Sequence, residues 1–219
     1  MSLGDLIFLF CVAAGAAAVL GAAVQFLRGS HRAARRQLAG VGVCVALYAT
    51  ILIATSVLAP QTVIPPGAQR CWDDWCLTVE RAERTEVIPP GIAADADHDL
   101  LVLTLRIASR ARRVPQRESG VRLFILDASG TRYDTDSSAQ QAMLASGTAG
   151  DSIGTVLAPG ASFVHHEVFR VPRTATGLGL GKDAPGPVAV IIGDEGSLLH
   201  KRTVQRLSDE ARSARSRAE

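Results

Sequence analysis

One hexapeptide of the chain combines two thiols, two carboxylates and two indoles: it reads CWDDWC from Cys71 to Cys76. Its C-x4-C spacing differs from the C-x2-C of zinc ribbons and thioredoxin-like redox sites. The spacing favours a disulfide between Cys71 and Cys76 if this part of the chain reaches an oxidising compartment. Two alternatives stay open: a metal site that adds the two aspartates to the thiols, and a redox switch.

The same hexapeptide carries our candidate contacts with a partner, which are Trp72, Asp73, Asp74 and Trp75. We expect Trp75 to pack inward and Trp72 to be exposed, where an indole between acids can contact a protein or the membrane interface. The alternative interpretation is that one or both rings only cover the end of the fold.

Other chemistry-bearing residues do not form a recognisable site. His165 and His166 are neighbours in a predicted strand, so their side chains face opposite ways and cannot share a metal without a bulge. His98 is flanked by aspartates, but no D-x-D-x-D-G spacing follows, which favours a solvated loop over a calcium site. The run Gly177–Gly181 opens no helix and is not a phosphate loop. We therefore expect no catalytic residue, cofactor or metal, and no enzymatic activity.

These candidates follow two uncharged runs of 22 residues, Leu6–Leu27 and Leu38–Ala59. Each run is long enough to cross a bilayer as a helix, since about 20 apolar residues cover the hydrocarbon core. Between them lies a basic turn, residues 28–37. Its four arginines are our topology-determining residues: Arg28, Arg32, Arg35 and Arg36. The pattern predicts a transmembrane hairpin over residues 1–59.

The charges on either side of the hairpin predict its orientation. Only Asp5 and the amino terminus are charged before the first span, and no cation follows the second span until Arg70. Because short basic loops stay in the cytoplasm, the turn should be cytoplasmic, with the N-terminus and residues 60–219 outside it. A signal peptide is disfavoured because Leu6–Leu27 is too long and its basic residues follow it. We expect a multi-pass protein of the cytoplasmic (inner) membrane.

Composition narrows the class further. The net charge of +2 implies no nucleic-acid partner, and the predominance of arginine, alanine and glycine is typical of a GC-rich bacterial genome. Small residues in Ala13–Ala23 favour close packing of the two spans, with homo-oligomerisation as an alternative. Cys11 and Cys44 lie inside the spans, where each acts as a small apolar residue.

Beyond a proline-rich linker, residues 60–70, the pattern changes to the period of two that is typical of strands. In the clearest strand one face carries Leu101, Leu103, Leu105 and Ile107, and in the first we expect Leu77, Val79 and Arg81 on one face. The expected strands are Trp75–Thr85, Leu100–Ser109, Val121–Asp127, Phe163–Val171, Val188–Gly193 and Leu198–Leu207. A short helix is expected over Ser137–Ala145, capped by Ser137 or Ser138, and a loop over Pro172–Pro187. Short strands between Gly/Pro turns predict an antiparallel β-sandwich over residues 71–207, followed by a polar tail, 208–219.

Three segments, LVLTLRIASRARR, FILDASGTRYD and LAPGASFVHHEVFRVP, occur in an informative order. Their order resembles the immunoglobulin-like, or telokin-like, extracytoplasmic domain of unknown function on bacterial lipoproteins and membrane proteins, over roughly residues 75–195. The matching positions are Asp127, Gly130 and Tyr133 of a D-x-x-G-x-x-Y motif; Leu157, Pro159 and Gly160 of an L-x-P-G turn; and Phe169, Val171 and Pro172 of an F-x-V-P strand end. The resemblance implies an Ig-like fold and no catalytic residues.

The sequence thus predicts a mainly β protein with a two-helix transmembrane hairpin. Its expected function is a membrane-anchored, extracytoplasmic binding or scaffolding module of the bacterial envelope. Its expected partners are the lipid bilayer and another envelope or membrane protein. The alternatives are an accessory subunit of a membrane complex that is recognised through the hairpin and, least favoured, an enzyme.

Overall fold

The computed structural model describes residues 3–118, 120–183, 190–191, 197 and 199–208. Its contacts divide the chain into two compact units. The first is Met1–Gln61 with Gly186–Arg202, and the second is Thr62–Pro185 with Thr203–Glu219. Each unit is described by itself.

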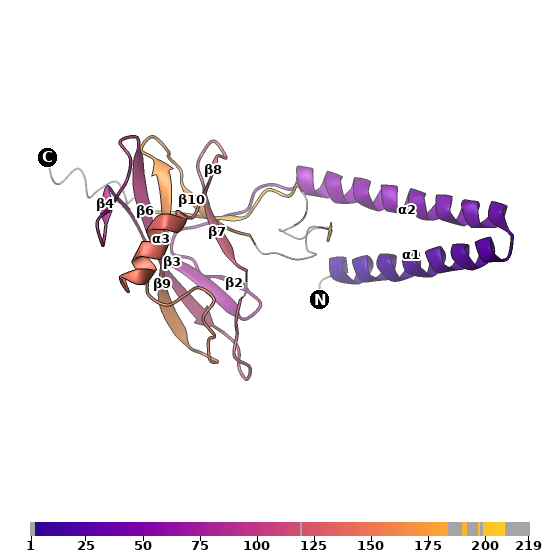
Figure 1. Ribbon diagram of the computed structural model, residues 1–219, viewed down its shortest axis with the longest axis horizontal. Helices are drawn as coiled ribbons and strands as arrows, with labels where there is room; N and C mark the ends of the chain where they lie inside the picture. Colours follow the sequence, from indigo (N-terminus) through magenta and orange to yellow (C-terminus); the bar gives the residue numbers. More distant parts are fainter. Residues whose placement is uncertain (1–2, 119, 184–189, 192–196, 198, 209–219) are drawn as a thin grey trace. The chain divides into compact units, whose positions relative to one another are not determined.

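Two long helices form most of the first unit: α1 (Leu3–Leu27) and α2 (His31–Leu58) (Figure 1). Both are long and apolar enough to cross a membrane. Helix α2 begins at His31 and not at Leu38, because residues 31–37 contain no proline or glycine to delay it. Of the four topology-determining arginines, Arg28 therefore lies in the turn, whereas Arg32, Arg35 and Arg36 lie in the first turns of α2.

The two helices contact each other through small residues near the turn. Ala22 and Ala34 are each only 2% exposed. Gln37 reaches across from α2 and donates its Nε2 hydrogen to the backbone oxygen of Ala18 at 2.9 Å. A Cβ at Gly21 would lie 2.9 Å from that nitrogen, so glycine is the residue that leaves room for it. The small residues thus serve the packing of the two helices within one chain.

The second unit is a β-sandwich of two main sheets (Figure 1). One contains β1 (Val63–Ile64), β11 (Val204–Arg206), β10 (Gly179–Asp183), β7 (Arg122–Leu126) and β8 (Arg132–Asp134), in that order. The other contains β2 (Arg70–Trp72), β3 (Trp75–Thr85), β6 (His98–Ser109) and β9 (Ser162–Pro172). A small third sheet pairs β4 (Val87–Ile88) with β5 (Ile92–Ala93). Every named strand pair is antiparallel except β1–β11. The predicted fold class, a β-sandwich with two apolar N-terminal helices, is confirmed.

The core lies between the two main sheets. The predicted inward face of β6 is confirmed: Leu101, Leu103, Leu105 and Ile107 are all 0% exposed. They pack in one cluster with β7 and β10 residues that include Ile125 and Leu180. The opposite face of β6 is partly covered too, because Leu100 clusters with Met143 of helix α3 (Ser137–Ala145). Burial on both faces explains the nearly continuous apolar run in β6.

Two strands differ from their predicted patterns. In β3 a bulge shifts the register between Val79 and Arg81, so Ala82 points inward and Arg81 is exposed. Residues predicted as loop form β10, because glycine there leaves room for a neighbouring ring. A Cβ at Gly181 would meet the Phe124 ring at 2.3 Å.

Three other expectations need correction, and two lie largely outside the described residues. Helix α3 is capped by Asp136, which accepts from two backbone N–H groups, and not by Ser137 or Ser138. Within the linker 60–70, Val63 and Ile64 form β1. The last predicted strand, Leu198–Leu207, is shorter than expected, since β11 covers only Val204–Arg206. Of the predicted strand Val188–Gly193 only residues 190 and 191 are described, and neither is in a strand, while the tail lies outside the description beyond residue 208.

Candidate functional site

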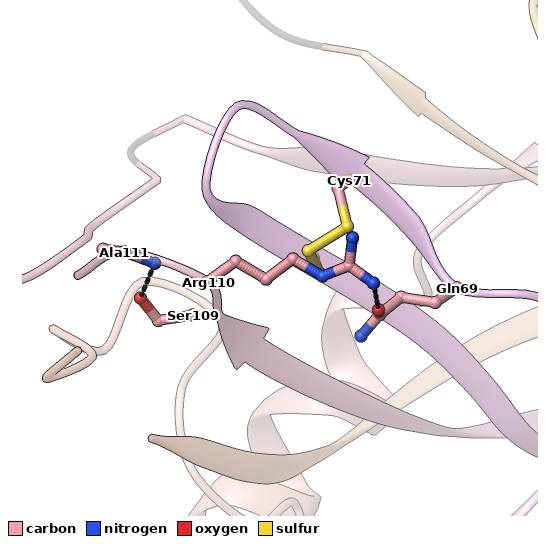
Figure 2. The surroundings of a disulfide bond; sticks show 6 residues. Gln69, Cys71, Ser109, Arg110 and Ala111 are labelled. Carbon is pink, nitrogen blue, oxygen red and sulfur yellow. Dashed lines mark hydrogen bonds between the residues drawn. A yellow bond between two sulfur atoms is a disulfide. The ribbon is translucent and has the colours of Figure 1, made fainter. Parts of the chain in front are cut away.

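The CWDDWC segment forms the β2–β3 hairpin. Cys71 lies directly opposite Cys76, and the two are joined by a disulfide bond. Asp73 and Asp74 form the two-residue turn, with Asp73 at a φ of 51°, a left-handed conformation that aspartate tolerates better than most residues. Beside the disulfide, Arg110 donates a hydrogen bond to the side-chain oxygen of Gln69 (Figure 2). Closing so short a loop stabilises the fold by about 2 kcal/mol in the chain-entropy treatment.

The two tryptophans of the hairpin lie at different depths. Trp75 is 2% exposed and belongs to the core, whereas Trp72 is half-buried. The centroids of the two rings lie 5.6 Å apart. The Lys182 ammonium lies 4.0 Å from the Trp72 centroid and 2.8 Å from the Glu118 carboxylate. A cation over an indole face is attracted by the ring quadrupole. Trp72 is therefore held in place by charge as well as by packing.

This geometry shows which of the four predicted contact residues are accessible to a partner. Trp75 cannot present its indole to a partner, because the ring is buried. Asp73 and Asp74 are exposed, and Trp72 reaches the surface in part. Disulfide sulfurs are not thiolates, so they cannot join the aspartates as metal ligands. Among the described residues, no group of three His, Cys, Asp or Glu side chains could hold a metal ion.

A second feature of the sandwich is a cavity of about 330 Å³. Val121, Leu123 and Ile153 contribute its apolar part. Its polar wall consists of Arg122, Arg132, Asp134, Thr135, Ser137 and Glu167. Arg132 already forms two ion pairs, with Asp134 at 2.7 Å and with Asp183 at 2.6 Å. Arg122 is exposed and has no ion-pair partner among the described residues. Among the residues that the structure describes, the cavity thus presents mixed charge with one cation outside any ion pair.

Behind this wall lies a buried pair, His165 and Glu167. His165 Nε2 lies 2.6 Å from a Glu167 carboxylate oxygen, and its Nδ1 lies 2.8 Å from the backbone oxygen of Asp151. Because both ring nitrogens face acceptors, one proton must lie on Nδ1 and another in the bond between Nε2 and the carboxylate. The Thr135 hydroxyl donates to the other Glu167 oxygen at 2.5 Å and not to the imidazole. The hydroxyl is therefore bonded to the carboxylate, unlike the serine of a Ser–His pair, which is bonded to the imidazole.

The neighbouring histidine faces the other way, as the strand period predicts. His166 Nδ1 lies 3.3 Å from the Thr104 hydroxyl on the opposite side of the sheet. Burial lowers the pKa of His166 below its usual value, and the nearby His165 lowers it further. Neutral His166 is thus favoured, which suits a structural side chain.

The family-like motif residues fulfil structural roles. One Asp127 oxygen accepts from the backbone N–H groups of Ser129 and Thr131, and the other accepts from the Tyr133 hydroxyl at 2.9 Å. The Ser129 hydroxyl, which also donates to this carboxylate, is the main cause that lowers its pKa. Burial, followed by the Asp127 hydrogen bond, raises the pKa of Tyr133. Gly130 supplies the φ of 82° that the turn requires.

The acidic loop around His98 is not simply solvated, as the sequence had suggested. Asp99 is 5% exposed. It lies 3.6 Å from Arg84 and 3.4 Å from Arg173. These ion pairs connect the start of β6 to the ends of β3 and β9, so Asp99 stabilises the fold.

The sequence did not identify Lys182, Glu118 or Glu167 as parts of these clusters. Lys182 offered a weak signal, because it is one of only two lysines in a chain rich in arginine. Glu167 is two residues from His165 in a strand, a spacing that places both on one face. Their partners come from distant segments, which no local pattern reveals. The topology-determining residues Arg28, Arg32, Arg35 and Arg36 are all exposed at the turn end of the helical unit.

Comparisons with known proteins add little to this geometry. No protein-family model matches the chain, and no curated protein matches it either. An uncharacterised β-sandwich protein from Clostridium difficile 630 is similar in structure, with a TM-score of 0.42 and 9% identity over 68% of this chain and 95% of its own. A secreted protein from Mycobacterium tuberculosis, MPT63, gives a TM-score of 0.39 and 11% identity over 58% of this chain and 99% of its own. A conserved hypothetical protein from Bacillus anthracis gives a TM-score of 0.41 and 15% identity over 55% of this chain and 88% of its own. At these TM-scores the likenesses carry no argument about function, and the telokin-like family is not confirmed.

Proposed function

We propose that the chain is a membrane-anchored module of the bacterial envelope whose β-sandwich binds or organises another envelope protein outside the cytoplasm. Helices α1 and α2 anchor it as a hairpin in the cytoplasmic membrane, with the turn in the cytoplasm. The N-terminus and the sandwich lie on the other side. The module binds its partner without transforming a substrate.

The charge distribution around the helices carries this proposal. All four arginines of the segment 28–37 are exposed at the turn end. Short basic loops are retained in the cytoplasm, so this end of the hairpin is assigned to the cytoplasmic side. The disulfide of the β2–β3 hairpin supports the same orientation, because disulfides persist in oxidising compartments outside the cytoplasm.

Topology is the first test. A reporter that is active only in the cytoplasm should be active when inserted after Ser30, and silent when fused after Glu219. Replacing Arg32, Arg35 and Arg36 together by glutamate should scramble this pattern, because the retention signal is removed. The matched control replaces the same residues by lysine, which should preserve it. A reporter that is active after Glu219 in the unaltered chain would contradict the proposed compartment.

Binding to a partner is the second test. Two surfaces of the sandwich are candidates for the binding site. One is the hairpin tip with its exposed Asp73 and Asp74. The other is the cavity wall with its exposed Arg122. The full-length protein should co-purify with a specific envelope protein from native membranes. Arg122→Glu should abolish this if the cavity binds, and the double change Asp73→Asn with Asp74→Asn should abolish it if the tip binds.

The accessory-subunit alternative gives a different outcome. If the same partner is recovered with α1–turn–α2 alone and is lost from the sandwich alone, the hairpin is the recognition element. That result would contradict the proposed role of the sandwich.

A further inference from the structure

One face of α2 is buried away from the turn. Tyr48 is half-buried, Leu52 is 5% exposed and Ser56 is 1% exposed. Their spacing of four residues places them on one stripe of the helix. The most buried α1–α2 contacts, Ala22 and Ala34, lie near the turn. Away from the turn α1 and α2 diverge (Figure 1). A part of the chain beyond the two helices contacts this stripe at Tyr48.

The described contacts identify that part as the connection between β10 and β11. The Tyr48 hydroxyl donates to the backbone oxygen of Val190 at 2.7 Å. Close by in the chain, Ser197 is 1% exposed and donates to the backbone oxygen of Ile191. Near the end of α2, the Gln61 side chain donates to the backbone oxygen of Arg202 at 3.1 Å. Contacts accordingly group Gly186–Arg202 with the helices and not with the sandwich.

Tyr48 lies far from the end of the helix. It precedes Leu58 by ten residues, which corresponds to about 15 Å at a rise of ~1.5 Å per residue. That distance is about half of the ~30 Å hydrocarbon core. The two described residues at this point of the connection, Val190 and Ile191, have apolar side chains, which suits this depth.

The hydrogen bond itself is the one that such a depth requires. A tyrosine hydroxyl and a backbone carbonyl outside an α-helix would each lack a partner in hydrocarbon, at a cost of several kcal/mol per unsatisfied group. Bonded to each other, both are satisfied. Irregular backbone is tolerated at membrane depth only where it packs against protein, and the stripe of α2 provides that surface.

We propose that the β10–β11 connection re-enters the membrane at Val190–Ile191 and binds the Tyr48–Leu52–Ser56 face of α2 in the outer half of the bilayer. This inference rests on the proposed topology, in which α2 crosses the membrane and ends outside the cytoplasm. It gives the chain a third membrane contact in addition to its two spans.

Single cysteines in the full-length protein test the proposal in intact cells. Cys11 and Cys44 are first replaced by alanine, and the disulfide is kept. Val190→Cys is the probe, because the Val190 side chain is 41% exposed and the contacts with α2 do not enclose it. Ala145→Cys, at the exposed end of α3, reports the outside, and Ser30→Cys reports the turn. The reagent is a maleimide that does not cross membranes.

Ala145→Cys should be labelled in intact cells, and Ser30→Cys only after permeabilisation. Val190→Cys should escape labelling in both cases and react once detergent dissolves the membrane. Adding Tyr48→Phe should increase its labelling, because the hydrogen bond that holds Val190 is lost. The matched control Thr50→Val should leave the labelling unchanged, since Thr50 bonds only to the backbone oxygen of Ala46 in its own helix.

The outcomes separate this inference from the function on which it rests. If Val190→Cys is labelled as readily as Ala145→Cys while Ser30→Cys stays protected, the re-entry is wrong and the topology stands. If Ser30→Cys is labelled in intact cells, the topology itself is wrong. Labelling of Val190→Cys that Tyr48→Phe leaves unchanged would overturn the assignment of Tyr48 as its partner.

Discussion

Asp127 organises the turn between β7 and β8 with both of its carboxylate oxygens. One oxygen accepts from the N–H groups of Ser129 at 2.8 Å and Thr131 at 2.9 Å, and the other accepts from Tyr133. Asp127→Asn leaves a single acceptor oxygen, so either the turn or Tyr133 loses its partner. We expect the free energy of unfolding to fall by about 1.5–3 kcal/mol, as for hydrogen bonds to charged groups. Urea denaturation measures this difference.

Tyr133→Phe is the matched control, because it removes only the phenol oxygen. It should cost about 1 kcal/mol, and the double variant should cost less than the sum, since the two groups share one bond. Strict additivity would show that the Asp127–Tyr133 hydrogen bond contributes nothing.

The lowered pKa of Asp127 also predicts a pH dependence. The carboxylate is favoured in the folded state, so its contribution is complete above the unfolded pKa of about 3.8 and is lost as the pH falls through the lower folded value. The stability difference between the wild-type protein and Asp127→Asn should therefore be constant near neutral pH and shrink below about pH 4. Denaturation curves collected from pH 3 to pH 7 check this. A difference that grows on acidification would contradict the assignment.

For single residues, the sequence predicts which face of a strand a side chain lies on better than which side chain it contacts. Alternation placed His165 and His166 on opposite faces, and the structure agrees. It could not show that His165 meets Asp151, or that Lys182 lies over Trp72, because those pairs join segments far apart in the chain. Trp72 was expected to be exposed, because no residue near it in the sequence indicates that a cation lies above its ring.

Helix α3 protects the open edge of β9 through one side chain. Gln140 donates from Nε2 to the backbone oxygen of His166 at 2.8 Å and accepts from the N–H of Val168 at 3.0 Å. Its amide thus takes the place of a peptide group in a neighbouring strand. Unpaired strand edges are templates for aggregation, and this contact closes the edge at its centre.

Gln140→Ala should therefore destabilise the sandwich. It leaves a carbonyl and an N–H of β9 without their side-chain partner, which costs about 1–3 kcal/mol. The variant should also exchange its Val168 amide hydrogen faster, as hydrogen exchange measures directly. Gln141→Ala is the matched control, because Gln141 is exposed on the same helix. Surface changes of that kind usually stay within about 0.5 kcal/mol. Equal effects of the two variants would refute the role of Gln140.

Elements with side-chain alternation could be predicted, and elements without it could not. Strand β3 and helix α3 have the predicted limits, Trp75–Thr85 and Ser137–Ala145. Strand β10 was missed because glycine has no side chain to alternate, and its role depends on Phe124 of β7. The predicted caps of α3, Ser137 or Ser138, lie one or two residues after the observed cap, because Asp136 and the serines after it are all good caps.

For the whole molecule, composition separates the helical part from the sandwich, but it does not assign every segment. The apolar runs and the change of period beyond residue 70 predict two parts. The grouping of Gly186–Arg202 with the helices depends on tertiary contacts, and the hydrogen bond between Tyr48 and Val190 joins the same two parts. A sequence pattern cannot show such contacts, because the partners are separated by 142 positions.

The boundary between the parts makes a last prediction, on where the sandwich begins. Strand β1 lies in the segment expected to be a linker, yet Val63 pairs with Val204 of β11, and the Val204 N–H donates to the Thr62 oxygen at 3.0 Å. A fragment of residues 62–208 should fold with the far-ultraviolet spectrum of a β protein. A fragment of residues 68–208 should fold too, but with a free energy of unfolding lower by about 1–2 kcal/mol, because each lost backbone bond contributes about 0.5–1.5 kcal/mol.

Urea denaturation of both fragments, with the Cys71–Cys76 disulfide intact, measures the difference. The dependence on urea should be nearly the same, since few residues are removed and the slope follows the surface exposed on unfolding. Equal stabilities would show that β1 is a spacer, as the prolines of the linker had suggested. An unfolded 62–208 fragment would instead mean that the sandwich requires the helices, which would move the boundary of its folding unit to the N-terminus of the chain.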